Sequence, residues 1–553
     1  MSPLWIDALV VLLYFTLIVT IGLRAGRGDT SMDSFAIGDR NIPWWAVLAS
    51  ILAAEISAAT FLGAPGEGYA TRNFTYAQLA IGTVLARIII AGVFIKPFYD
   101  FRVVSIYEYL ALRFGSHTRT AASALFLVTR ALASGTRLYV AAIVLVMGYE
   151  LASGKSLSPM DQVGIYAGAL LFLTGITALY TAVGGIKAVV WTDLIQATLM
   201  FGSLGFAIWN LLHSIPNGWQ GMRDVLSGPK DFSIIDLGLV AGAGFWENVK
   251  SILESEYTIW AALIGSTFTT MATHGTDQDM VQRMLTARDH HKSRLSLVLS
   301  GLADLPLVLC FLLVGMLLWT YYQQPGKDAP FAFYIVHELP PGIRGILFAG
   351  IFATAMGSLS TALNALATSF TQDWYKTRIR PQASDAEVLR AARWSTVVFA
   401  LVLVVIGTAT AYAKIILHAR IIPIVLGIFG YTYGSLLGVF LIGLLTKNRG
   451  SEKGNLVAMS IGFIAVAALS GLHNDLWALL HPAAALGEVQ PILWAPSWLP
   501  RVEFPWRIAV GTTVTFLTAL LFKTPAEQLE IARLHLLQPP SQKGPVSNAP
   551  HKS

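Results

Sequence analysis

Apolar runs long enough to cross a membrane recur along the whole chain, and short polar segments separate them. A helix needs roughly 20 apolar residues to span a bilayer, and on that measure the pattern predicts about thirteen spans. Their expected limits are 4–24, 44–70, 76–98, 119–149, 162–182, 188–213, 255–275, 293–320, 343–371, 391–412, 421–445, 454–472 and 506–522. The pattern therefore predicts an all-α, polytopic membrane protein with a single transmembrane domain over residues 1–523.

Lys and Arg are concentrated in alternate loops between these spans. The loops in question contain Arg24, Arg27 and Arg40, then Lys96, Arg102, Arg113 and Arg119, then Arg283, Arg288, Lys292 and Arg294, then Lys376, Arg378, Arg380, Arg390 and Arg393, then Lys447, Arg449 and Lys453. Basic loops stay on the cytoplasmic side of a membrane. We therefore expect an integral protein of the cell (inner or plasma) membrane, with its N-terminus outside and its C-terminus in the cytoplasm.

Three segments outside the spans have distinct expected roles. The external stretches 214–254 and 473–505 contain Trp, Pro and Gly, and we expect them to cap an outer vestibule. The cytoplasmic tail, residues 524–553, starts with a short amphipathic piece over 526–537. Its remainder is polar and rich in Pro, Ser and Lys, a composition that favours disorder.

Composition excludes several classes of function. Only 13% of the residues are charged, against about 25% in a typical soluble protein. The net charge of +6 belongs to short loops and does not indicate nucleic-acid binding. A single cysteine, Cys310, excludes a disulfide framework and a thiolate metal site. No P-loop or dinucleotide fingerprint occurs in the right context, so no enzyme activity is predicted.

Polar residues and glycines interrupt the second span. Glu55, Ser57 and Thr60 break its apolar pattern, and three glycines and Pro65 follow between residues 63 and 68. A discontinuous helix frees backbone carbonyls near the middle of the membrane, where they can coordinate an ion. Such backbone is tolerated only where it lines a cavity or is buried in protein. The alternative is an ordinary proline kink.

A second unusual stretch lies between Gly345 and Lys376. Thr354, Gly357, Ser358 and Thr361 follow i, i+3, i+4, i+7 spacing, so they share one helical face. Hydroxyl groups need partners in hydrocarbon. Two interpretations remain open, which are close packing of small residues against another helix and a helix that lends hydroxyl oxygens to a hard cation such as Na⁺.

Ionisable residues within the spans are the third unusual feature. They are Glu55, Arg87, Arg130, Arg137, Asp193 and Asp304. A central arginine costs about 2.5–3.5 kcal/mol on insertion scales, so it faces the protein interior or a cavity. Either these residues pair with one another, for example Glu55 with Arg137, or one arginine holds a substrate carboxylate by a bidentate fork. Arg137 is our candidate for the second role.

Five motifs together resemble the sodium/solute symporter family, which includes sodium/glucose and sodium/proline transporters. They are ASILAAEISA (49–58), GGIKAVVWTDLIQ (184–196), GTDQ with QR (275–278 and 282–283), the 345–376 stretch with Thr371, Asp373, Tyr375 and Lys376 at its end, and FLIGLLTK (440–447). They occur in family order from about residue 30 to 460. The resemblance implies a LeuT-like fold, in which two inverted repeats of five helices, over 44–213 and 255–445, follow one extra helix and precede further C-terminal helices.

The resemblance also implies Na⁺-coupled uptake by alternating access, with one or two Na⁺ as coupling ions. The positions that match the family's main sodium site are Ala53, Ile56, Thr354, Gly357 and Ser358. Gly357 stands where many members have Ser, so water or Thr361 would have to complete that site. A second sodium position, described in a sialic acid transporter of the family, matches Asp193, Ser360 and Thr361.

The solute pocket does not carry over from the family's sugar transporters, because Glu55 and Thr60 replace an Asn and a Gln. By position, our candidates for solute binding are Glu55, Ser57, Thr60, Gln78, Arg137 and Thr273. Arg137 favours an anionic or carboxylate-bearing small solute. The alternatives are a sodium-coupled sugar or polyol symporter, a proton-coupled symporter (suggested by Gly357, Glu55 and Asp304) and a solute sensor. Expected partners are a solute, Na⁺ and the lipid bilayer, and no sequence feature indicates an oligomeric state.

Overall fold

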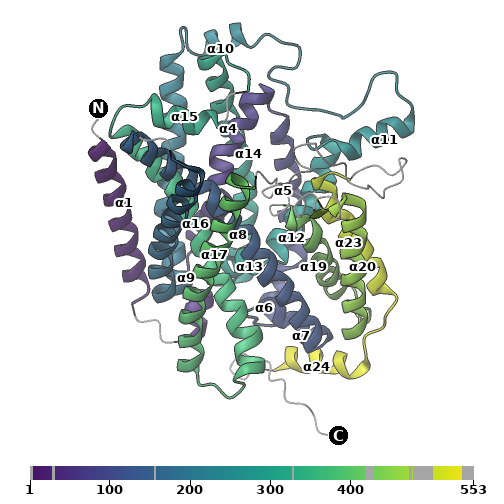
Figure 1. The fold of residues 1–553 in the computed structure, drawn as a ribbon. Helices are drawn as coiled ribbons and strands as arrows, with labels where there is room; N and C mark the ends of the chain where they lie inside the picture. The colour runs from purple at the N-terminus through teal and green to yellow at the C-terminus, as the bar shows by residue number, and fades with distance from the viewer. Residues whose placement is uncertain are drawn as a thin grey trace.

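The computed structural model describes residues 4–27, 31–154, 157–326, 329–417, 427–472, 476–477 and 502–538, and these ranges are predominantly helical (Figure 1). The longer helices are α1 (Leu4–Ala25), α3 (Trp44–Glu55), α4 (Ala58–Thr71), α5 (Leu79–Val93), α8 (Ser116–Ser153), α9 (Pro159–Ser214), α14 (His290–Tyr322), α16 (Ile343–Phe370), α17 (Asp385–Ile415), α19 (Ile428–Leu445), α20 (Glu452–Ser470) and α23 (Phe504–Leu520). The described ranges contain no β-strand, so the all-α prediction is confirmed.

Shorter helices connect these elements. They are α2 (Met32–Ile37), α6 (Ile95–Asp100), α7 (Tyr107–Phe114), α10 (Trp219–Val225), α11 (Phe245–Glu254), α12 (Thr267–Gly275), α13 (Gln278–Leu285), α15 (Pro330–His337) and α24 (Ala526–Leu537). Tighter 3₁₀ turns cover 38–40 and 75–78, and wider π-helical turns cover 261–266 and 371–379. Helices α10 and α11 lie in the predicted outer cap over 214–254, whereas 478–501 of the second predicted cap and 539–553 of the tail fall outside the described residues.

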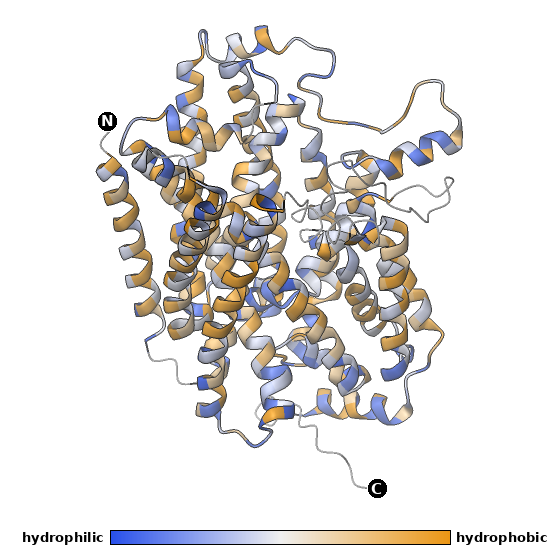
Figure 2. Cartoon of the chain, in the orientation of Figure 1, coloured by the Kyte–Doolittle hydropathy of each residue, from blue (hydrophilic) through white to orange (hydrophobic). Residues whose placement is uncertain are grey.

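Nine of the described helices are long and apolar enough to cross a membrane, or ten if the bent pair α3–α4 counts as one span. The ribbons of the long helices are coloured mostly as hydrophobic in Figure 2. The predicted number of thirteen spans is not confirmed. The predicted spans 162–182 and 188–213 lie in the two halves of the long element α9. The stretch 255–275 is helical only from residue 259 onwards, and α23 has only 17 residues.

Gly185 reverses the chain within α9. Its backbone has φ 50° and ψ −146°, which is not helical, and a side chain there would lie 2.4 Å from the carbonyl oxygen of Phe35. The first half of α9 packs Phe172 against Phe15 and Tyr180 against Gly22, parallel to α1. The second half runs back along α16. Only glycine fits this conformation and this close contact, so α9 acts as two antiparallel helices.

Asp7 attaches the first helix to the start of α16. One carboxylate oxygen accepts hydrogen bonds from the backbone N–H groups of Gly342 (2.7 Å) and Gly345 (2.9 Å). The other oxygen forms an ion pair with Arg344, at 2.6 Å from Nη2. An anion at a helix N-terminus complements the helix dipole and its unpaired N–H groups. Helix α1 is therefore an integral part of the fold.

Replacing Asp7 by Ala should destabilise the protein. The change leaves the buried Arg344 without its counter-ion, and breaking a buried pair costs about 3–5 kcal/mol. We expect a clearly lower midpoint of thermal unfolding for D7A in detergent. Asp224→Ala, which removes an exposed acid in α10, is the matched control and should leave the midpoint unchanged. Equal midpoints for the two variants would contradict this role of Asp7.

One face of the molecule gathers the basic loops around α24 (Figure 1). Gln528 donates hydrogen bonds to the carbonyls of Ala111 and Leu112 at the end of α7. The ring of His535 stacks on Phe101, beside Arg102. We call this the α24 face. The opposite side contains α10, α11 and α15, and we call it the α10 face.

Candidate functional site

The second predicted span is interrupted between α3 and α4, so the prediction of a discontinuous helix is confirmed. The two helices meet at an angle of 64°, and Ile56 and Ser57 between them have extended backbone with ψ 98° and 166°. Ser57 Oγ accepts a hydrogen bond from the backbone N–H of Thr60 (3.4 Å), which caps the start of α4. The break thus presents the carbonyl end of α3 and the N–H end of α4 side by side.

A cavity of about 350 Å³ lies against this break. Its walls come from α3, α4, α5, α8, α12, α14, α16 and α19. Five of the six predicted solute-binding residues line it, namely Glu55, Ser57, Thr60, Arg137 and Thr273. The volume lies at the small end of the range for ligand pockets, about 300–1,000 Å³, so it suits a small organic molecule.

Gln78, the sixth predicted residue, is placed elsewhere and does not line the cavity. Its side-chain nitrogen donates to the carbonyl oxygens of Thr75 (3.1 Å) and Tyr257 (3.4 Å). Its side-chain oxygen accepts from the backbone N–H of Asp236 (3.2 Å). Gln78 therefore ties the segment before α12 to the start of α5. The sequence gives no hint of this, because the partners are far away along the chain.

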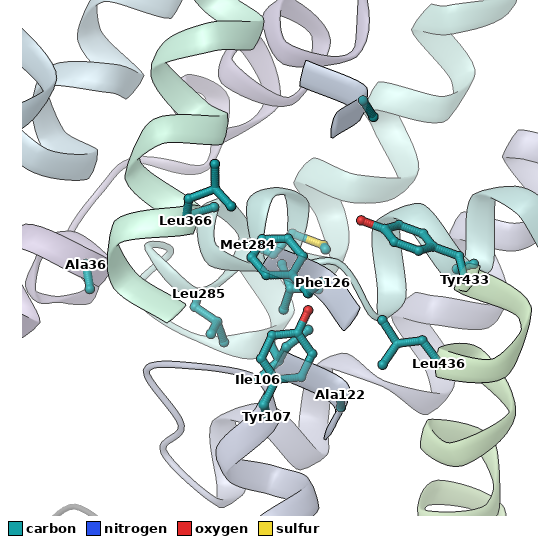
Figure 3. Packing of buried hydrophobic residues seen from close by; sticks show 14 of the residues in the cluster. Ala36, Ile106, Tyr107, Ala122, Phe126, Met284, Leu285, Leu366, Tyr433 and Leu436 are labelled. Carbon is teal, nitrogen blue, oxygen red and sulfur yellow. The ribbon is translucent and has the colours of Figure 1, made fainter. Parts of the chain in front are cut away.

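The cavity is closed towards the α24 face, and α8 shows the successive layers of this closure. From that face inward, α8 presents Arg119, Phe126, Arg130 and Arg137, and it rises about 27 Å from the first to the last of these. Arg119 forms an ion pair with Asp373 at 2.7 Å. The next layer is apolar, as Figure 3 shows, and comes from six helices and Ile106: Ala36, Ile106, Tyr107, Ala122, Phe126, Met284, Leu285, Leu366, Tyr433 and Leu436.

Polar groups of α13 complete the closure above this apolar layer. Asp277 accepts hydrogen bonds from Arg130 Nη1 (3.1 Å) and from the hydroxyl of Tyr433 (2.7 Å). Arg130 also pairs with Asp279, which in turn binds Arg283 at 2.8 Å. Helix α12 ends at Gly275, and its polar continuation lies below the cavity.

Glu55 and Asp304 form one charged wall of the cavity. Glu55 pairs with Arg87 through one carboxylate oxygen, and His274 lies 3.6 Å from the same oxygen. Arg87 is fully buried behind this wall and also donates to Ser300 Oγ (3.0 Å). The second oxygen of Glu55 is buried and has no hydrogen-bond partner among the described residues. The sequence suggested a Glu55–Arg137 pair, but the structure pairs Glu55 with Arg87.

Arg137 lies on a different wall, on α8. Within the described ranges it forms no ion pair or hydrogen bond, in contrast to Arg87 and Arg130. Its guanidinium lies over the ring of Phe429, with 5.2 Å between Cζ and the ring centroid. A cation–π contact satisfies the face of a guanidinium but not its in-plane N–H donors. These donors are available to a molecule in the cavity.

Helix α16 passes the break at Gly357, and three oxygens gather there. A Cβ placed on Gly357 would lie 3.3 Å from the carbonyl oxygen of Ala53, 3.1 Å from Gln196 Oε1 and 3.7 Å from Asp193 Oδ1. Asp193 is fully buried. Its Oδ2 accepts from Ser50 (2.5 Å) and lies 3.4 Å from Arg283, whereas its Oδ1 has no partner within the described part of the chain. An unpartnered carboxylate oxygen in the interior favours a bound cation.

The hydroxyl groups of α16 have their protons engaged within the helix. Thr354 donates to the carbonyl of Ile351 (2.8 Å), Ser358 to Ala355 (3.1 Å), and Thr361 to Ser358 (2.9 Å). Ser360 donates likewise, to Gly357 at 3.1 Å. Each oxygen keeps free lone pairs after donating its proton. Ser358 and Ile56 line the same cavity, so this hydroxyl lies on the side of the helix break.

Sequence reasoning missed Gln196. Both polar atoms of its side chain are buried and have no partner among the residues described, and its oxygen points to the space beside Gly357. Gln196 follows Asp193 at i+3, so the two share a helical face. That spacing, read with the absent side chain at Gly357, was the available signal.

Comparison with known proteins places the chain among transporters. A model of the sodium:solute symporter family matches residues 35–462. The chain is 26% identical to human sodium-coupled monocarboxylate transporter 1, covering 79% of this chain and 68% of that protein. It is 24% identical to the sodium/sialic acid symporter SiaT of Proteus mirabilis, covering 88% and 94%, and 27% identical to the human sodium/iodide cotransporter, covering 77% and 62%.

Solved structures support the fold. A substrate-bound, outward-open Na⁺-coupled sialic acid symporter superimposes with a TM-score of 0.74 at 20% identity, covering 93% of this chain and 97% of that one. The nucleobase-cation-symport-1 transporter Mhp1 in a closed conformation gives 0.51 at 13% identity, covering 92% and 99%. The LeuT-like fold expected from the motifs is thereby confirmed.

Proposed function

This chain belongs to the sodium:solute symporter family, and from that premise we propose that it takes up a small carboxylate-bearing solute. It is an integral membrane transporter and not an enzyme, and Na⁺-coupled symport of a small solute is its activity. The solute class, the ligands of each ion and the orientation in the membrane are the parts that we propose.

Arg137 carries the proposal of a carboxylate. Its side chain lines the cavity, and no acid in the described ranges forms an ion pair with it. A planar guanidinium binds a carboxylate through two parallel hydrogen bonds, which a neutral solute cannot provide. The N-terminus of α4 at the break adds a partial positive charge to the same cavity. The relatives named as transporters of monocarboxylates, sialic acid and iodide all carry anions.

For Na⁺ we propose two adjoining positions around the passage of α16 past the break. The first uses the carbonyls of Ala53 and Ile56 with the hydroxyls of Thr354 and Ser358. The second uses Asp193, Ser360 and Thr361. At the first position, Gln196 Oε1 supplies the oxygen that Gly357 lacks. Hard cations prefer such oxygen ligands. The shared location of Ala53 O and Asp193 Oδ1 beside Gly357 supports this arrangement.

We place the α24 face in the cytoplasm, because the basic loops lie there. The repeats over 44–213 and 255–445 each contain one interrupted helix, at 56–57 and at 276–277. Alternating access then requires the layers below the cavity to separate, beginning with the Arg130–Asp277 pair. A single Na⁺ moving down 100 mV releases about 2.3 kcal/mol, which can support roughly 50-fold accumulation.

Uptake into proteoliposomes tests this function. With an inward Na⁺ gradient and no pH gradient, we expect accumulation of at least one small radiolabelled carboxylate from a panel of acids, sugars and polyols, and no accumulation when K⁺ replaces Na⁺. Neutral sugars of similar size should not compete. If only sugars compete, the proposal of a carboxylate solute is refuted. Uptake that follows a pH gradient without Na⁺ would favour proton coupling.

A further inference from the structure

We propose that the solute also carries a protonated amine, so that the cavity binds a compact zwitterion with its carboxylate at Arg137 and its ammonium at Glu55 and Asp304. This inference rests on the proposed carboxylate site at Arg137. It adds a second, acidic subsite for the ammonium group to the same cavity.

The acidic wall has two carboxyl groups, and only one of them forms an ion pair with an arginine in the described ranges. Glu55 and Asp304 both line the cavity, and Arg87 forms its ion pair with Glu55. Arg87 donates to one oxygen of Glu55 through Nη2 and to Ser300 Oγ through Nη1. Within the described ranges no ion pair joins Arg87 to Asp304, whose Oδ2 accepts only a hydrogen bond from Thr83 at 3.3 Å. The carboxyl group of Asp304 therefore has no cationic partner at ion-pair distance among the described residues.

Arg137 does not supply the missing cationic partner of Asp304. The two walls face one cavity, yet within the part of the chain that the structure describes no ion pair joins Arg137 to Glu55 or Asp304. Opposite charges that remain apart in a poorly solvated interior are costly. A ligand with a carboxylate at one end and an ammonium at the other satisfies both at once.

The lining between the two charged walls fits a short hydrocarbon spacer. Leu138 and Ala141 of α8 and Leu307, Val308 and Phe311 of α14 contribute apolar surface to the same cavity. The second oxygen of Glu55, which is buried without a partner among the described residues, can accept from an ammonium. The cavity volume of about 350 Å³ suits a short solute.

Matched ligand pairs test the inference on the purified full-length protein. Each pair consists of an ω-amino acid with one to five methylenes and the unsubstituted carboxylate of the same length, titrated in saturating Na⁺ and followed by thermal shift. We expect one spacer length at which the amino acid binds at least 30-fold more tightly than its partner. Equal affinity within every pair overturns the inference.

Two variants assign the effect to the acidic wall. Asp304→Asn should lower the affinity for the preferred amino acid at least tenfold and leave that of the amine-free carboxylate unchanged. Thr83→Val, which removes the hydroxyl that binds Asp304, should lower the amino acid's affinity less and serves if D304N does not fold. A loss that is equal for both ligands overturns the inference.

The outcome separates this inference from the proposed function. If amine-free carboxylates bind and amino acids do not, the ammonium subsite is wrong and the carboxylate site stands. If neither ligand binds in Na⁺ while the protein is folded, the proposed carboxylate site itself is wrong. If the affinity of the amine-free carboxylate depends on pH and the amino group adds nothing, a bound proton occupies the acidic wall. That result also overturns the inference.

Discussion

Arg137→Lys should lower the uptake of a carboxylate solute about 100-fold, with the protein still folded. Lysine keeps the charge but offers a point donor in place of a planar fork. A fall of this size corresponds to about 2.7 kcal/mol, close to the value of one charge-assisted hydrogen bond and some loss of alignment. The loss should appear mainly as weaker solute binding, because Arg137 contacts Phe429 and no described carboxylate.

The matched control is Arg390→Lys, an exposed arginine of α17 on the α24 face. It makes the same chemical change outside the cavity, and uptake should remain at the wild-type level. The measurement is the concentration of solute at half-maximal uptake at saturating Na⁺. Wild-type affinity in Arg137→Lys would remove the carboxylate fork from the account.

Asp193→Asn should raise the Na⁺ concentration for half-maximal uptake by 30-fold or more. The substitution keeps the shape of the side chain and still allows contacts with Ser50 and Arg283. It removes the charge from Oδ1, the oxygen that points towards Gly357 without a partner in the described ranges. A 30-fold change corresponds to about 2 kcal/mol, within the range expected for an interaction with a charged, buried group.

Asp7→Asn is the control for the loss of a buried carboxylate. Asp7 is also buried and paired with an arginine, but it lies at the start of α16, far along that helix from Gly357. Its variant should be less stable and should keep the wild-type dependence on Na⁺. If Asp193→Asn lost stability alone, with an unchanged Na⁺ titration at the temperature where it is folded, the second sodium position would be excluded.

The periodicity of apolar residues was sufficient for the helices but not for their number. Hydropathy predicted separate spans over 162–182 and 188–213, and the structure joins them in α9 with a reversal of the chain at Gly185. Hydropathy also predicts too long a helix over 255–275. The helix there starts only at residue 259, and residues 261–266 are π-helical. The polar residues Glu55 and Ser57 correctly marked the break between α3 and α4, whereas Pro65 and its neighbouring glycines lie inside α4.

Side-chain partners were the harder part of the site. The sequence shows six ionisable residues in membrane spans, but helices distant along the chain decide which of them pair. Glu55 pairs with Arg87 of α5, and Arg130 pairs with Asp277 and Asp279. Arg137 is left without an acidic partner among the described residues. The same reason explains the two glutamines. Gln78 was predicted to bind solute but bonds to the segment before α12, whereas Gln196 was not predicted and its oxygen points to Gly357.

The central claim is that Na⁺ is bound where α16 passes the break between α3 and α4. Equilibrium binding of radiolabelled Na⁺ to the purified full-length protein tests this claim most directly. The proteins to compare are the wild type, Ser358→Ala and the control Ser203→Ala. Ser203 of α9 lies beside Gly350, two turns of α16 away from Gly357. The account predicts saturable binding in the wild type and in Ser203→Ala, and at least tenfold weaker binding in folded Ser358→Ala. Equal Na⁺ affinity in all three proteins would contradict it.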